Sequence, residues 1–284
     1  MAKTVNFGYL PEEYSNLNDA QIVIIPVPYD QTSTWVKGAD GGPAAIIEAS
    51  TNMELYDIET GTEVYLKGIF TEKALDARVY PDEMVEAVRT KVLGHIERGK
   101  FTVVVGGEHS VSIGAIRAHA QSDPDITVLQ LDAHSDLRDE YNGSKYNHAC
   151  VMARVKELCP IVQVGIRSMD STEKDSMDTD MVFFAKDTHN RTDWHDQVVE
   201  KLSDKVYITI DLDVFDPSEM PSTGTPEPGG LLWYDVLALL RLVFEKRQVV
   251  GFDVAELCPD SKNRAPDFLA AKLIYKLLSY RFKD

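Results

Sequence analysis

The sequence predicts an α/β fold, a three-layer α/β/α sandwich around an eight-stranded parallel sheet, and two patterns indicate it. Short runs rich in β-branched residues recur along the whole chain, and stretches with helical spacing of apolar residues separate them. Most of these runs are continuously apolar, as expected of strands buried on both faces of a parallel sheet. Right-handed crossovers between such strands place helices on both faces. Because a closed eight-stranded barrel has the same periodicity, this pattern alone leaves the choice between open sheet and barrel undecided.

The expected elements alternate from one end of the chain to the other. The candidate strands are Gln21–Val27, Val64–Phe70, Phe101–Val105, Ile126–Leu131, Ile161–Val164, Met181–Phe184, Val206–Ile210 and Val249–Asp253. The candidate helices are Pro81–Arg98, Val111–Ala120, Ala149–Glu157, Asp193–Leu202, Trp233–Glu245 and Pro266–Tyr280. Two Gly/Pro-dense stretches, Gly38–Pro43 and Pro217–Gly230, are predicted to be ordered functional loops. Since no repeat or linker interrupts this order, residues 1–284 are expected to form a single domain.

The composition narrows the classes of partner. The chain has 29 Lys and Arg against 46 Asp and Glu, a formal net charge of −17, and 44% of its residues are hydrophobic. Nucleic-acid phosphates and anionic membranes would repel such a protein, whereas a cationic substrate or metal ions suit it. Three cysteines without CxxC spacing predict neither a disulfide scaffold nor a thiolate zinc site. With no signal peptide and no apolar run long enough to span a membrane, a cytoplasmic protein is expected.

The clearest chemical signal follows the strand Ile126–Leu131. The next five residues are Asp132-Ala133-His134-Ser135-Asp136. In an extended chain, residues i, i+2 and i+4 share one face, so the two carboxylates and the imidazole point the same way. This donor set suits Mn²⁺, Fe²⁺ or Zn²⁺. Taken alone, the segment fits a solvated loop about as well as a metal site.

Two other strand ends carry residues of the same kind. Asp211 and Asp213 follow Val206–Ile210, and two like charges there need a cation or hydrogen bonds to offset their repulsion. His109 lies in Gly-Gly-Glu-His-Ser after Phe101–Val105, where the glycines permit a sharp turn. Because α/β sheets build their sites at the carboxyl ends of strands, the three segments together favour a metal site. Asp216 precedes a proline and is expected only to shape a turn.

These motifs resemble the three signatures of the ureohydrolases, the family of arginase, agmatinase and their relatives. The resemblance rests on GGEHS, DAHSD and TIDLDVFDP in that order, with PYD and GADGGP near the start and TGTPEPGG and DVAE near the end. It covers nearly the whole chain and is closest to agmatinase. It implies an open, arginase-like eight-stranded parallel sheet, assembled into homotrimers or homohexamers.

The resemblance also implies the cofactor and its ligands. Two Mn²⁺ ions per subunit would be held by six residues: His109, Asp132, His134, Asp136, Asp211 and Asp213. One ion would take His109, Asp132, Asp136 and Asp211, and the other Asp132, His134, Asp211 and Asp213. A bridging hydroxide would then attack the carbon of a guanidino group.

Two further residues match the family's catalytic positions. His148, in Tyr-Asn-His-Ala-Cys, matches the loop histidine that shuttles a proton to the leaving amine, although the family usually has His-Gly here. Glu256 matches the glutamate that grips the guanidinium through paired hydrogen bonds. Without the resemblance, a solvated loop histidine would be the simpler interpretation of His148. For Glu256 the alternative is a surface salt-bridge partner, but its position after the strand Val249–Asp253 favours the functional interpretation.

The expected reaction is hydrolysis of agmatine to urea and putrescine, a step of polyamine biosynthesis. The segment after DAHSD resembles that of agmatinase, and Asp139 or Glu140 would meet the amine end of this dication. Arg138 could equally hold a carboxylate, which leaves 4-guanidinobutyrate, 3-guanidinopropionate and arginine as alternative substrates. A different metal-dependent hydrolase of amides or phosphoesters and a non-catalytic metal-binding protein remain less favoured alternatives.

The remaining aromatic, histidine and cysteine residues are expected to be structural. The three tryptophans, Trp35, Trp194 and Trp233, are predicted in the core or between subunits. Cys159 and Cys258 are predicted to be buried small hydrophobes. Solvent-facing positions are expected for four histidines, His95, His119, His189 and His195.

Overall fold

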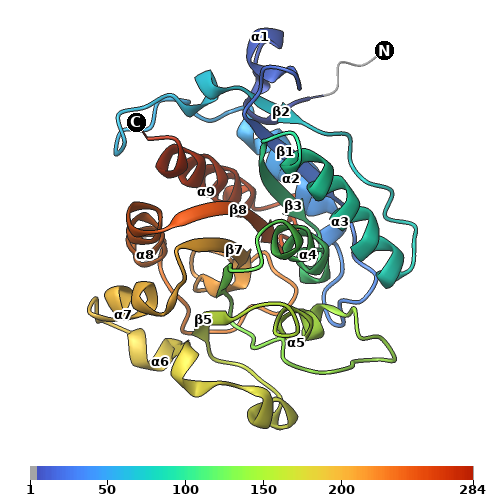
Figure 1. Ribbon diagram of the computed structural model, residues 1–284, viewed down its shortest axis with the longest axis vertical. Helices are drawn as coiled ribbons and strands as arrows, with labels where there is room; N and C mark the ends of the chain where they lie inside the picture. The colour runs from blue at the N-terminus through green and yellow to red at the C-terminus, as the bar shows by residue number, and fades with distance from the viewer. Residues whose placement is uncertain (1–4, 284) are drawn as a thin grey trace.

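A computed structural model describes residues 5–283 and, within them, one eight-stranded parallel sheet (Figure 1). The strands are β1 (Ile22–Val27), β2 (Ile69–Thr71), β3 (Phe101–Gly106), β4 (Thr127–Leu131), β5 (Ile161–Ile166), β6 (Val182–Phe184), β7 (Lys205–Asp211) and β8 (Gln248–Ala255). Their order is β2-β1-β3-β8-β7-β4-β5-β6, with β2 and β6 at the two edges. The predicted fold class is therefore confirmed, and the sheet is open rather than closed into a barrel.

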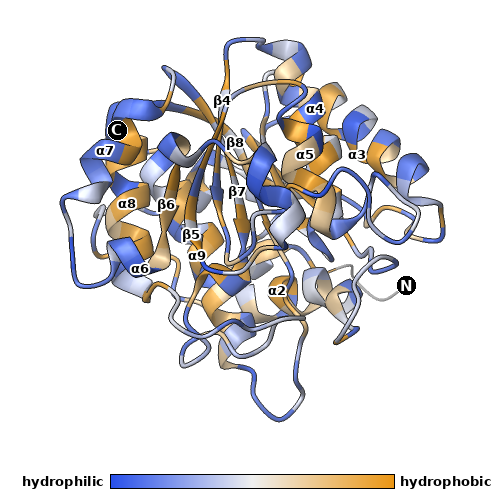
Figure 2. Ribbon diagram, turned by 90° about the horizontal axis from the view of Figure 1, so that it is seen from below, coloured by the Kyte–Doolittle hydropathy of each residue, from blue (hydrophilic) through white to orange (hydrophobic). Residues whose placement is uncertain are grey.

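Helices cover both faces of the sheet, which makes three layers (Figure 2). One face packs against α3 (Pro81–Ile96), α4 (Ser112–Ser122) and α5 (Val151–Val155). The other packs against α2 (Gly42–Ser50), α7 (Trp194–Lys201), α8 (Trp233–Lys246) and α9 (Ala265–Arg281). Two further short helices are α1 (Glu12–Ser15) and α6 (Ala185–Thr188).

The strands divide their side chains between the two layers with a period of two. In β1, Val23 and Ile25 pack toward the α3 side, while Ile22 and Ile24 pack toward the α9 side. Both sets are fully buried. The continuous apolar runs of the sequence are thus explained by burial on both faces.

Three predicted boundaries differ from the structure. Val64–Lys67 forms a 3₁₀ turn that ends at Gly68, so β2 begins only at Ile69. The helix predicted over Ala149–Glu157 is shorter, because a 3₁₀ turn over His148–Cys150 precedes α5. The Gly/Pro-dense segment before Ala44 does not remain a loop: Gly42 and Pro43 begin α2, since proline is well suited to the first turn of a helix.

Two histidines expected at the surface are buried, and one tryptophan lies outside the core. His95 and His119 are only 3% and 4% exposed, because they lie on the inner faces of α3 and α4. Trp35 is 79% exposed, so of the two predicted positions the core is excluded and a place between subunits stays a prediction, whereas Trp194 is buried. Cys159 and Cys258 are buried, as predicted.

Over residues 5–283, no helix combines the length and the apolar character that a bilayer crossing requires.

Candidate metal centre and active site

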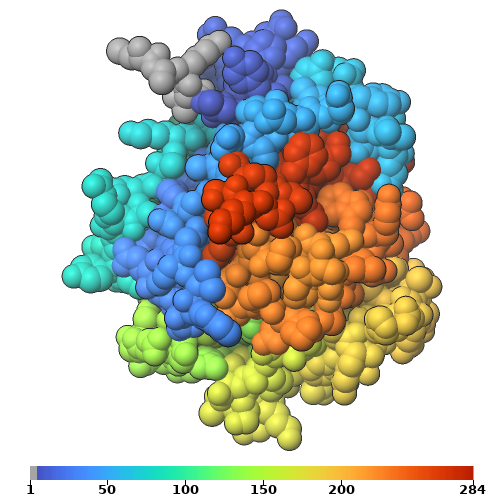
Figure 3. All heavy atoms as spheres, turned by 180° about the vertical axis from the view of Figure 1, so that it is seen from behind, coloured from blue at the N-terminus to red at the C-terminus, as the bar shows by residue number. Residues whose placement is uncertain are grey.

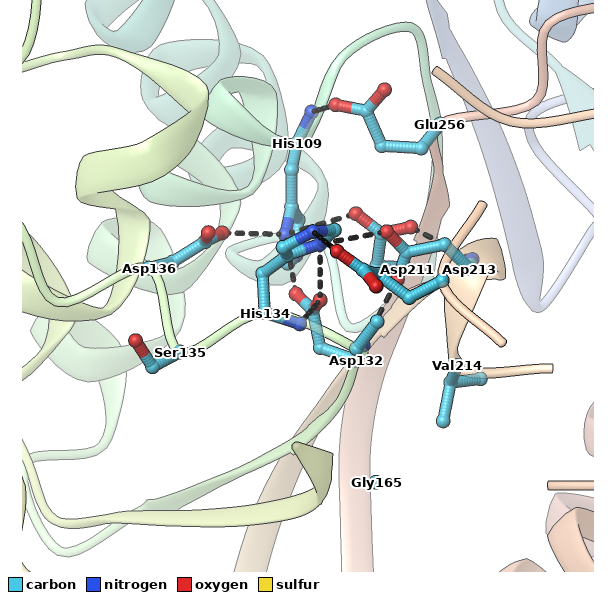
Figure 4. Close-up of polar contacts among 12 residues, drawn as sticks. His109, Asp132, His134, Ser135, Asp136, Gly165, Asp211, Asp213, Val214 and Glu256 are labelled. Carbon is cyan, nitrogen blue, oxygen red and sulfur yellow. Dashed lines mark hydrogen bonds and ion pairs between the residues drawn. The ribbon is translucent and has the colours of Figure 1, made fainter. Parts of the chain in front are cut away.

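Four neighbouring strands at the centre of the sheet supply the candidate site (Figure 4). In the order β3, β8, β7, β4 they end at the same edge, because the sheet is parallel. His109 follows β3, Glu256 follows β8, Asp211 ends β7 with Asp213 just beyond it, and the segment 132–136 follows β4. Residues that lie up to 147 positions apart in the chain are in this way brought into contact.

The six predicted ligands lie within a few ångströms of one another. His109 Nδ1 is 3.1 Å from an oxygen of Asp132, 3.1 Å from one of Asp136 and 3.6 Å from one of Asp211. His134 Nδ1 is 2.8 Å from Asp213 Oδ2 and 3.7 Å from Asp132 Oδ1. Two groups have ligand atoms that all lie within 4.8 Å of each other: His109, Asp132 and Asp211, and Asp132, His134 and Asp213. Asp132 belongs to both groups.

The electrostatics of this cluster favour bound cations. The four aspartates are at most 7% exposed. Burial, together with repulsion from Asp132, raises the pKa of Asp136 to about 7. Burial and the charges of Asp213 and Asp132 raise the pKa of Asp211 well above its usual value. Divalent cations would relieve this repulsion, and carboxylate oxygens with imidazole nitrogens are donors that manganese, iron and zinc accept, so the residues present fit a binuclear metal site.

The glycines before His109 permit a very close approach of two chain segments. A Cβ built on Gly107 would lie 2.0 Å from the backbone oxygen of Tyr29. The neighbouring Glu108 is completely buried and accepts hydrogen bonds from the backbone nitrogens of Thr32 (2.5 Å) and Ser33 (3.0 Å). The Gly-Gly-Glu segment therefore holds the loop that contains Tyr29, Thr32 and Ser33 against the site.

Sequence reasoning missed the residues that orient His109. Thr209 Oγ1 donates to Asp253 Oδ1 (2.8 Å) and therefore accepts from His109 Nε2, also at 2.8 Å. These hydrogen bonds leave Nδ1, which faces Asp132 and Asp136, as the ring nitrogen that could bind a metal ion. A carboxylate inside the apolar strand β8 was the available signal, because a buried charge needs such partners: Asp253 also accepts from Ser112 and Tyr207.

Two more buried polar residues hold the segment after β4. Gln130 Nε2 donates to Asp132 Oδ2 (2.7 Å). Glu173 accepts from the Ser135 hydroxyl, from the backbone of Leu137 (3.0 Å) and from Arg138 Nε (3.2 Å). These contacts stabilise Asp136, whose backbone has a φ of +53°, a conformation that is costly for a residue other than glycine.

His148 and Glu256 line the same cavity, of about 290 Å³, as five of the six predicted ligands. Burial lowers the pKa of His148 to about 4, and its Nδ1 lies 3.2 Å from Thr32 Oγ1. Glu256 accepts a hydrogen bond from the backbone nitrogen of His109 at 2.6 Å. Burial and the nearby charge of Glu108 raise the pKa of Glu256 to about 8. Its φ of +69° is a second costly conformation at this site.

The acidic residues expected at the amine end of the substrate lie elsewhere. Asp139 is exposed and pairs with Arg154 (2.5 Å) and Lys145 (3.4 Å), and neither it nor Glu140 lines the cavity. The physical reason is that the basic side chains hold this stretch at the surface. Arg138 does line the cavity, but Glu173 and Asp170 engage its guanidinium, the latter at 3.6 Å. Asp216 shapes a turn, as predicted, and accepts from the backbone of Ser218, Gly229 and Gly230.

Comparisons with known proteins agree with this fold. The model of the arginase family matches residues 20–279. The N(1)-aminopropylagmatine ureohydrolase of Synechocystis sp. is 41% identical over 95% of this chain and 92% of its own length, and the agmatinase of Pyrococcus horikoshii is 32% identical over 93% of each. The crystal structure of the agmatine ureohydrolase of Thermoplasma volcanium superposes with a TM-score of 0.87 at 31% identity, covering 100% of this chain and 95% of that one.

Together, the open parallel sheet and the paired carboxylate–histidine groups define a hydrolase with a candidate binuclear metal centre. The chain belongs to the arginase family. The resemblance to the agmatinase branch of the ureohydrolases, inferred from the sequence, is thereby confirmed.

Proposed function

We propose that the protein hydrolyses the guanidino group of agmatine, or of agmatine extended by an aminopropyl arm, to urea and the corresponding amine. The observation that carries this proposal is one cavity lined by members of both candidate metal groups together with Glu256 and His148. The names of the relatives support both substrates, since one is an agmatinase and the other acts on N(1)-aminopropylagmatine.

The proposed cofactor is a pair of Mn²⁺ ions. His109, Asp132, Asp136 and Asp211 would hold one ion, and Asp132, His134, Asp211 and Asp213 the other. When bound, such a pair lowers the pKa of water and supplies a nucleophile near neutral pH. The chain contributes the orientation of the donors, through Thr209 for His109 and Gln130 for Asp132.

Glu256 and His148 would act on the two ends of the reacting group. The Glu256 carboxylate would accept two parallel hydrogen bonds from the N–H groups of the guanidinium, the paired geometry that is strongest between these two groups. Thr32 donates to Glu108 and so accepts from His148 Nδ1, which leaves Nε2 of the same ring to carry a proton to the leaving amine. The leaving nitrogen departs as a neutral amine only when it gains that proton.

The test is a panel of guanidines assayed for urea after the purified protein is stripped of metal and reloaded with Mn²⁺. Agmatine, N(1)-aminopropylagmatine, arginine, 4-guanidinobutyrate and 3-guanidinopropionate would be compared. We expect agmatine and N(1)-aminopropylagmatine, which carry amines but no carboxylate, to have the highest kcat/KM. Removal of the metal by a chelator should abolish turnover. A dominant rate on any of the three carboxylates, or no urea from any compound, would overturn the proposal.

A further inference from the structure

A second, larger cavity of about 1030 Å³ adjoins the catalytic one. Five residues line both cavities, so the two lie side by side: Trp35, Val36, His134, Gly224 and Thr225. Apart from His134, the walls of the second cavity come from three stretches of chain, 35–37, 221–227 and 258–263. On the face drawn in Figure 3, these stretches appear in blue, orange and red-orange, side by side.

One residue in the wall of this cavity carries a buried hydroxyl group without a hydrogen-bond partner in the described part of the chain. Thr223 is only 4% exposed and lines the cavity, yet its Oγ1 finds no hydrogen-bond partner among the described residues. An unsatisfied buried hydroxyl costs about 1–3 kcal/mol. A ligand that donates a hydrogen bond to Thr223 would remove this cost.

The charges around the cavity favour a cationic ligand. Glu227 lines it with a carboxylate that is about one-third exposed and lies 3.9 Å from His134 Nε2. The cavity's Lys37 is already paired with Asp30 at 3.1 Å. The exposed indole of Trp35 stands at the junction of the two cavities, and aromatic faces attract ammonium groups.

The loop that carries Thr223 and Glu227 is held rigidly against the metal-site edge. Arg167 donates to the backbone oxygen of Asp213 at 2.6 Å and to that of Glu227 at 2.9 Å. One guanidinium therefore ties the turn after β7 to this wall of the second cavity. Such a preformed wall loses little conformational entropy when a flexible ligand binds.

We propose that the second cavity is the subsite for a terminal ammonium group carried beyond the butylamine segment of the substrate, with Thr223, Glu227 and Trp35 as its specificity-determining residues. The inference rests on the proposed function and narrows it to guanidino polyamines that have a second, more distant amine. In N(1)-aminopropylagmatine that amine lies three methylenes past the first one. The hydroxyl and the carboxylate accept its hydrogen bonds, and the indole covers its charge.

The test compares three substrates that carry none, one or two ammonium groups besides the guanidinium: butylguanidine, agmatine and N(1)-aminopropylagmatine. The variants are Glu227→Gln and Thr223→Val, with Glu200→Gln on α7 as a control for the change in net charge. We expect each cavity variant to lower kcat/KM about tenfold for the longest substrate, mainly through KM, and to leave the other two unchanged. Thr223→Val should not lower the Tm, because its hydroxyl makes no hydrogen bond within the described structure.

The outcomes separate the inference from the function on which it rests. If wild type releases urea but the cavity variants affect all three substrates equally or none, the proposed function stands and the subsite is refuted; an equal loss would mean that Glu227 acts through His134. If no guanidine is hydrolysed, the proposed function itself fails. Calorimetry tests the subsite without turnover: the triamine product should bind about tenfold more tightly than the diamine, and Glu227→Gln should abolish that difference. Equal binding of both amines to wild type would overturn the inference.

Discussion

Replacing Thr209 by valine tests whether the hydrogen-bond chain behind His109 prepares the metal site. The change keeps nearly the same shape but removes the oxygen that links His109 Nε2 to Asp253, both contacts being 2.8 Å long. His109 is 1% exposed and Asp253 fully buried, so neither group could find water instead. The imidazole would then lose the contact that fixes its tautomer.

This geometry predicts changes in two measurable quantities, the free energy of unfolding and the affinity for Mn²⁺. The free energy of unfolding should fall by about 1–3 kcal/mol, because a buried donor is left without a partner. The affinity for Mn²⁺ should fall about 10–100-fold, as is typical when a hydrogen-bond partner of a metal-bound histidine is removed. Urea denaturation of the metal-free protein measures the first, and calorimetric titration with Mn²⁺ measures the second.

The chain offers a matched control two strands away, in β3. Thr102 Oγ1 in β3 contacts His119 Nε2 at 2.9 Å, and both residues are at most 4% exposed, but His119 does not line the site cavity. Thr102→Val should therefore reduce stability by a similar amount and leave Mn²⁺ affinity unchanged. The reasoning is refuted if Thr209→Val binds Mn²⁺ like wild type, or if Thr102→Val weakens binding equally.

Three other predictions concern the turn before His109, a buried histidine and the guanidinium contact. Gly107→Ala should lower the free energy of unfolding, measured by urea denaturation, by about 3 kcal/mol, because the new Cβ would overlap the Tyr29 oxygen. Gly94→Ala in α3 is the control: nothing in the described structure lies within 4 Å of its Cβ, so the free energy of unfolding should rise by about 0.5–1 kcal/mol. Equal effects of the two substitutions would contradict the close approach at Gly107. Burial lowers the pKa of His119 to about 3 from its usual 6.5, so the unfolded chain binds a proton that the folded one does not, and stability should fall as the pH drops through this window. His119→Gln should flatten that slope in denaturation curves taken from about pH 7 to pH 4, and an unchanged slope would count against it. Glu256→Gln should lower kcat/KM roughly 100-fold for every guanidine while the fold persists by circular dichroism; a loss confined to one substrate would exclude a guanidinium contact.

Much of the fold was predictable because its signal is local. Strands buried on both faces are continuous apolar runs, and the six predicted ligands directly follow such runs. The strand order was not predictable in this way, since no local pattern says that β8 and β7 lie between β3 and β4. That long-range arrangement places Glu256 beside His109, and it also gives Thr209 and Asp253 their roles.

The residues at the amine end of the substrate were even harder to predict from the sequence than the strand order. Closeness in the chain to the DAHSD motif suggested Asp139 and Glu140, but Arg154 and Lys145 hold Asp139 at the surface. The acidic side chain that we propose for this role instead is Glu227, which lies far later in the chain, and its approach to His134 depends on the path of a loop. Chain proximity is a poor guide wherever loops converge at a sheet edge.

The predicted metal ligands and the residues proposed to select the substrate come from different parts of the fold. The six predicted ligands follow β3, β4 and β7, whereas residues 223–227 belong to one loop that lines both cavities. At their junction, a Cβ on Gly224 would lie 3.5 Å from the Val36 oxygen and 3.7 Å from Glu256 Oε2. The loop therefore reaches both the group proposed to grip the guanidinium and the cavity proposed for the distal amine. We therefore expect substitutions in this loop to change the length and charge of the preferred substrate while the strands keep the predicted metal ligands in place.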